Sequence, residues 1–335
     1  MENRLASPQR HLQPTPELDW SKPLVTVRCT VYNHEPYVRD VLEGFLLQET
    51  TFPFEVIVHD DASTDNSASI VKEYAEKYPH ILKPIYQTEN QFSKGKDRVK
   101  TILDQASNPS SIYWGICEGD DYWTDPLKLQ TQVDFMESHP DYSMCAASVD
   151  VLQEGKPLNF QGVKQDITLT THDAIVKGGG YFPTLTLLYR KELLDGLDEF
   201  REGCSVGDYP LQIFLSTKGK IMFLSRKVGV YRFMSVGSWT SRYSRDVKFY
   251  VRYLQNENKW LDLLNNKTHQ RYNKSFRFTI GRNLYKIMVY TKDVSIGRFN
   301  LDVFRYVCSL TPFKAVIFNL MAIYTPFLIP SKKRI

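Results

Sequence analysis

The sequence has few cysteines, little net charge and no glycine-rich phosphate-binding motif. Its 335 residues include only five cysteines, an odd number at wide spacing, which argues against a disulfide framework and for a reducing, cytoplasmic compartment. Lys and Arg exceed Asp and Glu by 42 minus 38, or four, an excess too small to favour nucleic acid as the main partner. Neither a Walker phosphate loop nor a Gly-x-Gly-x-x-Gly turn occurs.

Long hydrophobic runs are scarce as well. Residues 1–23 contain four prolines and no apolar core, so residues 1–22 are predicted to form a loose leader and neither a signal peptide nor an anchor. The apolar stretch 315–330 contains Asn319, is interrupted by Pro326, and is shorter than the roughly 20 residues that a bilayer requires. The sequence therefore predicts no transmembrane helix.

Hydrophobic periodicity alternates between strand and helix over the first 120 residues. Strands are predicted at 24–30, 54–59, 81–86 and 111–117, and helices at 38–48, 66–77 and 99–105. This alternation predicts an α/β fold with a mostly parallel, doubly wound sheet flanked by helices. Ligands of such sheets bind beyond the carboxyl ends of the strands, so the polar segments around Thr30, Asp60 and Asp120 are expected to converge on one site.

The remaining chain is less regular. A helix is predicted at 126–139, a strand at 144–152, a short strand at 185–189, a helix at 210–216, and a final pair of strands at 221–224 and 228–233. The glycines of Lys177–Gly180 follow a helix and are interpreted at most as an acceptor-side loop. We place a boundary near residue 240, between a catalytic domain of residues 23–240 and a helical C-terminal region of residues 241–335.

Two adjacent carboxylates, Asp120 and Asp121, directly follow a strand that is predicted to be buried. Buried carboxylates are costly unless a positive charge neutralises them, and hard oxygen ligands suit Mg²⁺ or Mn²⁺. A divalent manganese or magnesium ion that also binds a diphosphate would fulfil this need. The alternative is a helix N-cap cluster that precedes Pro126.

The run Glu118–Gln132, with the sequence Glu-Gly-Asp-Asp-Tyr-Trp-Thr-Asp-Pro-Leu-Lys-Leu-Gln-Thr-Gln, resembles the DxD-type signature of family-2 glycosyltransferases. Thr30–His34 resembles the first nucleotide-binding loop of that family, and Phe54–Asp65 its second strand and acidic turn. The resemblance covers about residues 22–240 in matching order and spacing. It implies a GT-A fold, a UDP-sugar or related donor, a divalent metal and inversion at the anomeric carbon.

The resemblance also implies a role for each matching residue. Thr30 and Tyr32 match positions that hold the nucleobase, and Asp60 or Asp61 matches the carboxylate that binds the uracil edge. Asp120 and Asp121 match the ribose and metal contacts. Because position 119 is Gly where a strict DxD motif has Asp, Asp121 is expected to carry most of the metal role.

Two further residues complete the expected site. Asp208, in Gly207–Leu211, resembles the second acidic motif of the family and is predicted to be the general base; the alternative is that it only caps the following helix. Arg232 matches a basic position after the last core strand, where a guanidinium group could bind a diphosphate through paired hydrogen bonds, although a surface arginine is an alternative.

The C-terminal third is rich in aromatic and basic residues on helical patterns. It is interpreted either as an appendage that shapes the acceptor pocket or as a peripheral surface for an anionic membrane. In the second case, apolar side chains between Phe313 and Met321 would enter the lipid interface, with basic residues 332–334 at its rim. The expected function is transfer of a sugar to a bacterial surface glycan or a lipid-linked acceptor. The alternative is an inactive nucleotide-sugar or carbohydrate-binding protein on the same fold.

Overall fold

The computed structural model describes residues 18–235, 241, 246–310 and 313–324, so most of the predicted leader lies outside the described residues. The chain forms two compact units. The first contains Met1–Leu169, Gly180–Asp195 and Leu215–Ser235, and the second contains Thr170–Gly179, Gly196–Phe214 and Val236–Ile335. Within the described part of the chain, no helix combines the length and the apolar character that crossing a membrane requires.

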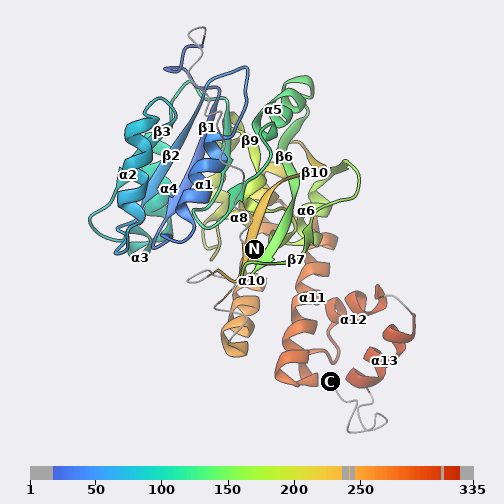
Figure 1. Cartoon of the computed structure of the whole chain (residues 1–335). Helices are drawn as coiled ribbons and strands as arrows, with labels where there is room; N and C mark the ends of the chain where they lie inside the picture. Colours follow the sequence, from blue (N-terminus) through green and yellow to red (C-terminus); the bar gives the residue numbers. More distant parts are fainter. Residues whose placement is uncertain (1–17, 236–240, 242–245, 311–312, 325–335) are drawn as a thin grey trace. The chain divides into compact units, whose positions relative to one another are not determined.

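The first unit is built on a ten-stranded sheet with the strand order β3-β2-β1-β4-β9-β6-β10-β5, to which β7 and β8 are added beside β6 and β10 (Figure 1). The strands are β1 (Val25–Val31), β2 (Phe54–Asp60), β3 (Leu82–Tyr86), β4 (Tyr113–Ile116), β5 (Tyr122–Trp123), β6 (Tyr142–Gln153), β7 (Lys156–Gln161), β8 (Ile167–Leu169), β9 (Leu188–Arg190) and β10 (Lys220–Phe233). The α/β fold expected from the alternating pattern is confirmed.

The four strands β3, β2, β1 and β4 are parallel, as the sequence predicts. Both β1 and β2 are almost completely buried, and the register pairs Val31 at the end of β1 with Asp60 at the end of β2. The helices of this unit are α1 (Val38–Leu46), α2 (Ser67–Lys77), α3 (Gln91–Lys94), α4 (Lys96–Ala106) and α5 (Lys128–Ser138), with 3-10 turns η2 (Thr184–Thr186) and η3 (Lys191–Leu194). The carboxyl ends of β1 and β2 therefore lie together.

The second half of the sheet is mixed, and two details differ from the sequence-based expectation. The predicted strand pair 221–224 and 228–233 is one strand, β10, which pairs with β6 in parallel through an irregularity between Leu224 and Val230. Only the end of the predicted strand 185–189 is a strand, because residues 184–186 form η2 and antiparallel β9 begins at Leu188. Periodicity could not show these differences, because an irregularity breaks the alternation without ending the strand.

The second unit is helical. It contains α6 (Thr171–Lys177), α7 (Leu197–Arg201), the first residues of α8 (Asp208–Lys218), α10 (Val247–Lys267), α11 (Asn273–Thr291), η4 (Val294–Ile296), α12 (Leu301–Cys308) and α13 (Phe313–Tyr324), while η1 (Gly179–Tyr181) begins at its boundary. Val303 and Val307 of α12 pack with Met288 of α11 and with Val316 and Ile323 of α13 in an apolar core. The helical character predicted for the C-terminal region of residues 241–335 is confirmed for the described residues.

Candidate active site

Two loops at the carboxyl ends of β1 and β2 bind each other through side chains. The backbone N–H of Asn33 donates to Ser63 Oγ at 2.9 Å, and the N–H of Thr64 donates to Asn33 Oδ1 at 2.8 Å. Asn33 and Ala62 both have positive φ, 55° and 63°, which is a sparsely populated conformation for residues with a side chain. The loops are therefore held in a defined conformation at the edge of the sheet.

Asp60 and Asp61 are both buried, but only one of them has its oxygen atoms fully engaged. Asp61 accepts hydrogen bonds from the backbone N–H groups of Gln91 at 2.7 Å and Phe92 at 3.0 Å, which caps α3. Asp60 Oδ1 accepts from the N–H of Ser63 at 3.0 Å, whereas its buried Oδ2 has no hydrogen-bond partner among the described residues. A buried acceptor without a donor is costly, so Asp60 is the one of the pair that is suited to bind a ligand N–H group.

The predicted nucleobase residues lie on the same edge. Thr30 is half-buried, and its carbonyl oxygen accepts a hydrogen bond from the N–H of Gly119 at 2.9 Å. Tyr32 follows β1 and is 45% exposed, which leaves its ring available to a planar ligand. The structure thus connects the first loop directly to the acidic turn that follows β4.

The acidic turn contains three carboxylates with oxygen atoms within 4.8 Å of one another: Glu118, Asp120 and Asp121. An ideal Cβ atom at Gly119 would lie 2.6 Å from His34 Nδ1 and 2.9 Å from the carbonyl oxygen of Thr30. The absence of an Asp at position 119 is therefore explained by close packing. Glu118, which our sequence analysis did not assign as a ligand, is the third carboxylate of the cluster.

The end of β10 and the residues directly after it also bind the acidic turn. The N–H of Arg232 donates to Asp121 Oδ1 at 2.8 Å, and Ser235 Oγ donates to Asp120 Oδ2 at 2.6 Å. Between them, Met234 has a positive φ of 62°. Both carboxylates are thus oriented by residues more than a hundred positions away in the sequence.

The Arg232 guanidinium group is enclosed in the same network. Its Nη1 donates to the carbonyl oxygen of Asp120 at 2.7 Å, and its Nη2 forms an ion pair with Asp40 of α1. Its Cζ atom lies 4.3 Å from the ring centre of Tyr122 and 5.0 Å from that of Tyr37. The interpretation of Arg232 as a surface arginine is wrong, because only 15% of the side chain is exposed.

A neighbouring carboxylate, that of Asp125, binds the backbone directly before α5. Asp125 accepts a hydrogen bond from the N–H of Leu127 at 3.1 Å, directly before α5, and pairs with Arg226 through both oxygen atoms. Asp120 and Asp121 instead bind Ser235 and Arg232, so the N-cap alternative does not explain the adjacent pair. Trp123 fixes the end of the turn, since its Nε1 donates to the carbonyl oxygen of Leu185 at 2.7 Å and Lys128 Nζ lies 3.9 Å from its ring centre.

The electrostatics of the turn suit a cation. Burial, followed by the charge of Asp120, raises the pKa of Asp121 well above its usual range, although the N–H of Arg232 opposes this shift. A divalent ion would offset both unfavourable effects, and three hard oxygen ligands match the preference of Mg²⁺ or Mn²⁺. The residues present therefore fit the metal that the sequence predicts.

Asp208 belongs to the second unit and is the first residue of α8. Burial raises the pKa of its half-buried carboxyl group, while backbone N–H groups at the start of the helix oppose the shift. Capping and general-base roles are therefore compatible at this position. Two glycines of the Lys177–Gly180 segment have structural roles. Gly178 ends α6 with a φ of 86°, and a Cβ atom on Gly179 would lie only 2.6 Å from Cβ of Tyr209.

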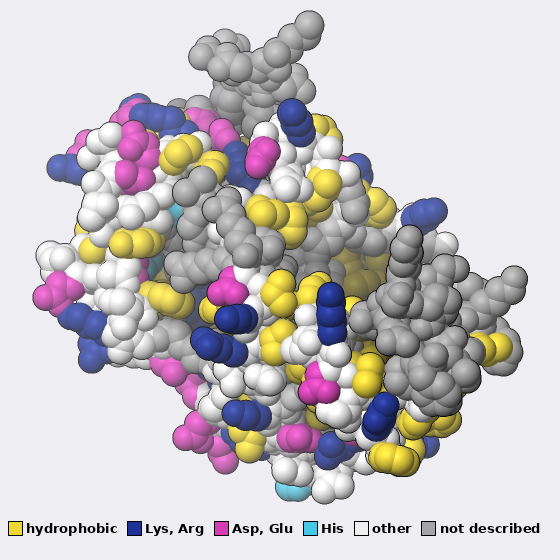
Figure 2. All heavy atoms as spheres, turned by 90° about the horizontal axis from the view of Figure 1, so that it is seen from below, with side chains coloured by type: hydrophobic (Ala, Val, Ile, Leu, Met, Phe, Trp, Pro, Cys, Tyr) yellow, Lys and Arg dark blue, Asp and Glu magenta, His cyan; other side chains and the backbone are white. Residues whose placement is uncertain are grey.

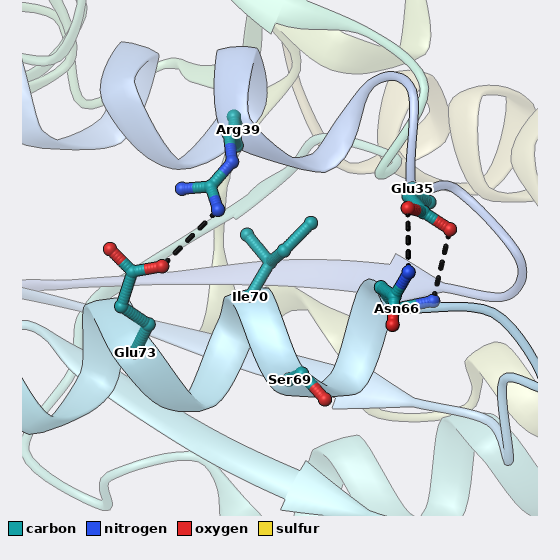
Figure 3. Close-up of a pocket in the computed structure, with 6 residues that line it drawn as sticks. All are labelled: Glu35, Arg39, Asn66, Ser69, Ile70 and Glu73. Atoms are coloured by element: carbon teal, nitrogen blue, oxygen red, sulfur yellow. Dashed lines mark hydrogen bonds and ion pairs between the residues drawn. The ribbon is translucent and has the colours of Figure 1, made fainter.

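A separate groove lies between α1 and α2 (Figure 3). Arg39 forms an ion pair with Glu73 across it, and Glu35 accepts hydrogen bonds from the backbone and side chain of Asn66. These polar groups bind one another across the groove. Its contacts hold α1 against α2, and the carboxylates of the acidic turn do not line it.

Sequence reasoning missed Glu118, Ser235 and Asp40. Glu118 had a local signal, because it lies two residues before Asp120. Ser235 and Asp40 had no local signal in the sequence. Ser235 binds Asp120 and Asp40 binds Arg232 only because distant elements pair and pack in the folded chain.

The chain is similar to known proteins in sequence and in fold. The sequence profile described as "Glycosyl transferase family 2" matches residues 26–194. The chain is 35% identical over 223 residues to the uncharacterized protein Rv1520 of Mycobacterium tuberculosis, a match that covers 65% of this chain and 61% of that protein. The chain thus matches about three fifths of the length of such curated relatives.

Solved structures share the fold. The structure of residues 1–349 of Staphylococcus aureus TarS in complex with UDP-GlcNAc aligns with a TM-score of 0.57 at 20% identity, covering 89% of this chain and 83% of that one. In the curated sequences, TarS is named a poly(ribitol-phosphate) β-N-acetylglucosaminyltransferase and is 29% identical over 177 residues, covering 52% of this chain and 28% of TarS. The mannosyltransferase PcManGT of Pyrobaculum calidifontis, in complex with GDP-Man and Mn²⁺, aligns with a TM-score of 0.53 at 18% identity, covering 91% and 82%.

Proposed function

Because the chain belongs to glycosyl transferase family 2 and has the GT-A fold, we propose that it transfers a sugar from a nucleotide-sugar donor to a hydroxyl group of an acceptor, with inversion at the anomeric carbon. The observation that carries this proposal is the convergence of the three-carboxylate turn and the unpartnered Asp60 oxygen on one edge of the sheet. A UDP-sugar is the donor that this site favours.

The donor is recognised by groups that the first unit already holds in place. Asp60 Oδ2 is the acceptor for the ring N–H of uracil, since it is buried and lacks a donor. Tyr32 offers an exposed ring on which the base stacks, and the backbone around Thr30 lines the other side. Asp61 stabilises this arrangement by capping α3, so the direct contact is assigned to Asp60.

The acidic turn is the site for a divalent ion, manganese or magnesium. Asp121 and Glu118 hold it, while Asp120 contacts the ribose and is oriented by Ser235. The chemistry that such an ion supplies when bound is neutralisation of the charge on the departing diphosphate. The paired diphosphate contact expected of Arg232 stays a prediction; its present partners favour a positioning role, in which it holds the turn.

Asp208 is the general base. Its carboxylate receives the proton of the acceptor hydroxyl as that oxygen bonds to the anomeric carbon and the bond to the diphosphate breaks. A carboxyl group with a raised pKa is a stronger base than one on the protein surface, which supports this assignment.

For the acceptor we propose a glycan or a lipid-linked glycan of bacterial surface polysaccharide biosynthesis. The name of TarS, which specifies a poly(ribitol-phosphate) acceptor, supports this class. A cytoplasmic enzyme that works on lipid-linked glycans also needs a membrane surface, and we propose that the second unit supplies it.

The apolar residues at the start of α12 support this membrane contact. Phe299 is 94% exposed at φ 59°, Leu301 is 58% exposed, and Phe304 is also exposed. Arg298 and Arg305 lie beside them, a combination that suits an anionic lipid interface. Figure 2 shows hydrophobic, basic and acidic side chains interspersed on the face that is seen from below. Of the membrane segment predicted from the sequence, the basic residues 332–334 lie outside the described residues.

The alternative is a protein that binds nucleotide sugars without turnover. Asp208→Asn distinguishes the two, because it removes the base without touching the proposed donor site. We expect UDP-sugar affinity within about twofold of the wild type and a loss of transfer of about a hundredfold or more. Binding is measured by calorimetry with Mn²⁺ present, and transfer by UDP release. Tight donor binding without UDP release in the wild type would establish the alternative.

A further inference from the structure

Helices α10 and α11 of the second unit form an antiparallel pair. In the middle of the pair, the side-chain amide of Asn283 donates to Asn258 Oδ1 at 3.0 Å. Toward the start of α10, the ring of Tyr250 lies 5.2 Å from the ring of Tyr290 near the end of α11, with an interplanar angle of 86°. Aromatic side chains from both helices therefore meet at the end of the pair where α10 begins.

A third ring extends this aromatic surface along α10. Tyr253 lies one turn after Tyr250, and their ring centres are 6.5 Å apart with nearly parallel planes, at an angle of 16°. We call Tyr250, Tyr253 and Tyr290 the tyrosine cluster. Tyr290 is 50% exposed and the other two are half-buried, whereas Trp260, which packs within the helices, is only 1% exposed. The tyrosine cluster thus keeps aromatic surface accessible to a ligand.

The tyrosine cluster lies on the face of α10 that packs against the candidate base. Trp260 follows Tyr253 by seven residues, or two turns, so both side chains share one face of the helix. The ring of Trp260 lies 5.4 Å from the ring of Tyr209, which directly follows Asp208. At the rise of an α-helix, Tyr253 is about 10 Å along the axis from Trp260. One face of α10 therefore connects the start of α8 with the tyrosine cluster inside a single unit.

The chemistry of this surface suits a sugar ring. A pyranose ring carries C–H groups on its faces, which pack on aromatic rings, and hydroxyl groups at its edge, which bind polar and charged side chains. Lys286 is half-buried on α11 one turn before Tyr290, and Lys248 and Arg252 are exposed on α10 beside Tyr250, so donors surround the rings. Because the same helix face continues to the candidate base, a glycan is favoured over a lipid as the occupant.

We propose that the tyrosine cluster is an acceptor subsite, on which a sugar ring of the glycan packs while another sugar of the same glycan presents its hydroxyl group to Asp208. This inference rests on the proposed function, which supplies the acceptor role. It assigns to the pair of helices α10 and α11 the binding of an oligosaccharide in preference to a monosaccharide.

The test is glycan binding by the whole chain, measured by saturation-transfer NMR titration with UDP and Mn²⁺ present. The probes are tetrasaccharides of β-linked glucose and of β-linked N-acetylglucosamine, with N-acetylglucosamine itself as the monosaccharide. We expect the wild type to bind at least one tetrasaccharide more tightly than the monosaccharide. Tyr290→Ala should weaken this binding by about five- to tenfold, and Tyr290→Phe, which keeps the ring, should stay within about twofold of the wild type.

Tyr324→Ala is the matched control, because Tyr324 is an exposed tyrosine of the same unit on α13. Its glycan affinity is expected to equal that of the wild type. Thermal unfolding shows whether each variant is folded. Tyr290 is half exposed, so its replacement should leave the helix pair intact.

The failures of the two proposals are distinguishable. Binding of neither tetrasaccharide by the wild type, or equal binding by Tyr290→Ala, would overturn the subsite. So would a loss in Tyr290→Ala of binding to vesicles with anionic lipid at unchanged glycan affinity, because the tyrosine cluster would then contact lipid. Glycan binding that depends on Tyr290, without UDP release by the wild type from any UDP-sugar tested, would overturn the proposed transfer and leave a glycan site.

Discussion

The two units bury carboxyl groups in different ways. Asp121, in the acidic turn of the first unit, is 2% exposed and has a backbone N–H and a neighbouring carboxylate within reach, with the cation expected from outside the chain. Glu257, in the second unit, is 6% exposed and faces two cations that the chain itself provides, Arg282 and Lys286. In both units burial outweighs the cations of the chain, Arg232 near Asp121 and Arg282 and Lys286 near Glu257, and only the acidic turn offers two further carboxylates that could share an added metal ion.

Substitution of Asp121 and of Glu257 should therefore have different effects. Neutralising Asp121 should remove a ligand site while relieving the cost of burial. Neutralising Glu257 should mainly change how the free energy of unfolding depends on pH. Each expectation can be checked separately, because the two groups lie in different units.

The largest effect is expected for Asp121→Ala. Loss of a ligand and of the contact with the N–H of Arg232 should reduce transfer by about a thousandfold or more, and the stabilisation by excess Mn²⁺, about 3 kcal/mol at a hundred times Kd, should disappear. UDP release and thermal unfolding with and without Mn²⁺ measure the two effects. Asp134→Asn on the surface of α5 is the control, and full activity of Asp121→Ala would show that the metal site is assigned wrongly.

A smaller effect is expected for Glu257→Gln on stability. The pKa of Glu257 is raised in the folded state from 4.5 to about 7, so the folded protein binds more protons in this window, and the free energy of unfolding falls as pH rises through it. The variant lacks this loss and should be up to about 3 kcal/mol more stable than the wild type at pH 8, with little difference below about pH 4.5. Urea unfolding at several pH values measures the difference; a difference independent of pH contradicts the expectation.

Asp60→Asn and Asp61→Asn compare two adjacent carboxylates within the first unit. Asp60→Asn should weaken UDP binding by about ten- to a hundredfold, because the buried acceptor is assigned to the uracil. Asp61→Asn should instead lower the free energy of unfolding by about 1 kcal/mol through a weaker cap of α3. Calorimetric titration with UDP and urea unfolding separate the two, and equal losses of UDP affinity would argue against Asp60 as the specific contact.

The smallest effect is expected for Phe299→Ser. Removal of an exposed apolar side chain should reduce binding to vesicles with anionic lipid by about threefold to tenfold without changing UDP release from a soluble system. Leu158→Ser, in an exposed position of β7, is the matched control in the first unit. If both variants bind vesicles as well as the wild type, the second unit does not provide the membrane contact through this residue.

Local sequence patterns were sufficient for part of the site. Alternating strands and helices placed Thr30, Asp60 and Asp120 at one edge, and adjacent carboxylates indicated the metal turn. The roles of Arg232 and Ser235 could not be predicted in the same way, because the pairing of β10 with β5 and β6 brings these residues to the turn. The choice between Asp60 and Asp61 also required the structure, since it depends on which oxygen atoms the backbone of α3 occupies.

Residues that are neighbours along the chain specify the α/β fold, the acidic turn and the helical nature of the C-terminal third, so these features can be predicted without a structure. Tertiary structure decided which carboxyl groups are buried, which are paired and which have an oxygen atom without a donor. Tyr209 and Trp260 are far apart in the sequence and meet only through the packing of α8 against α10. Burial and the distance between charges set the energy of a carboxylate, and both are properties of the folded chain.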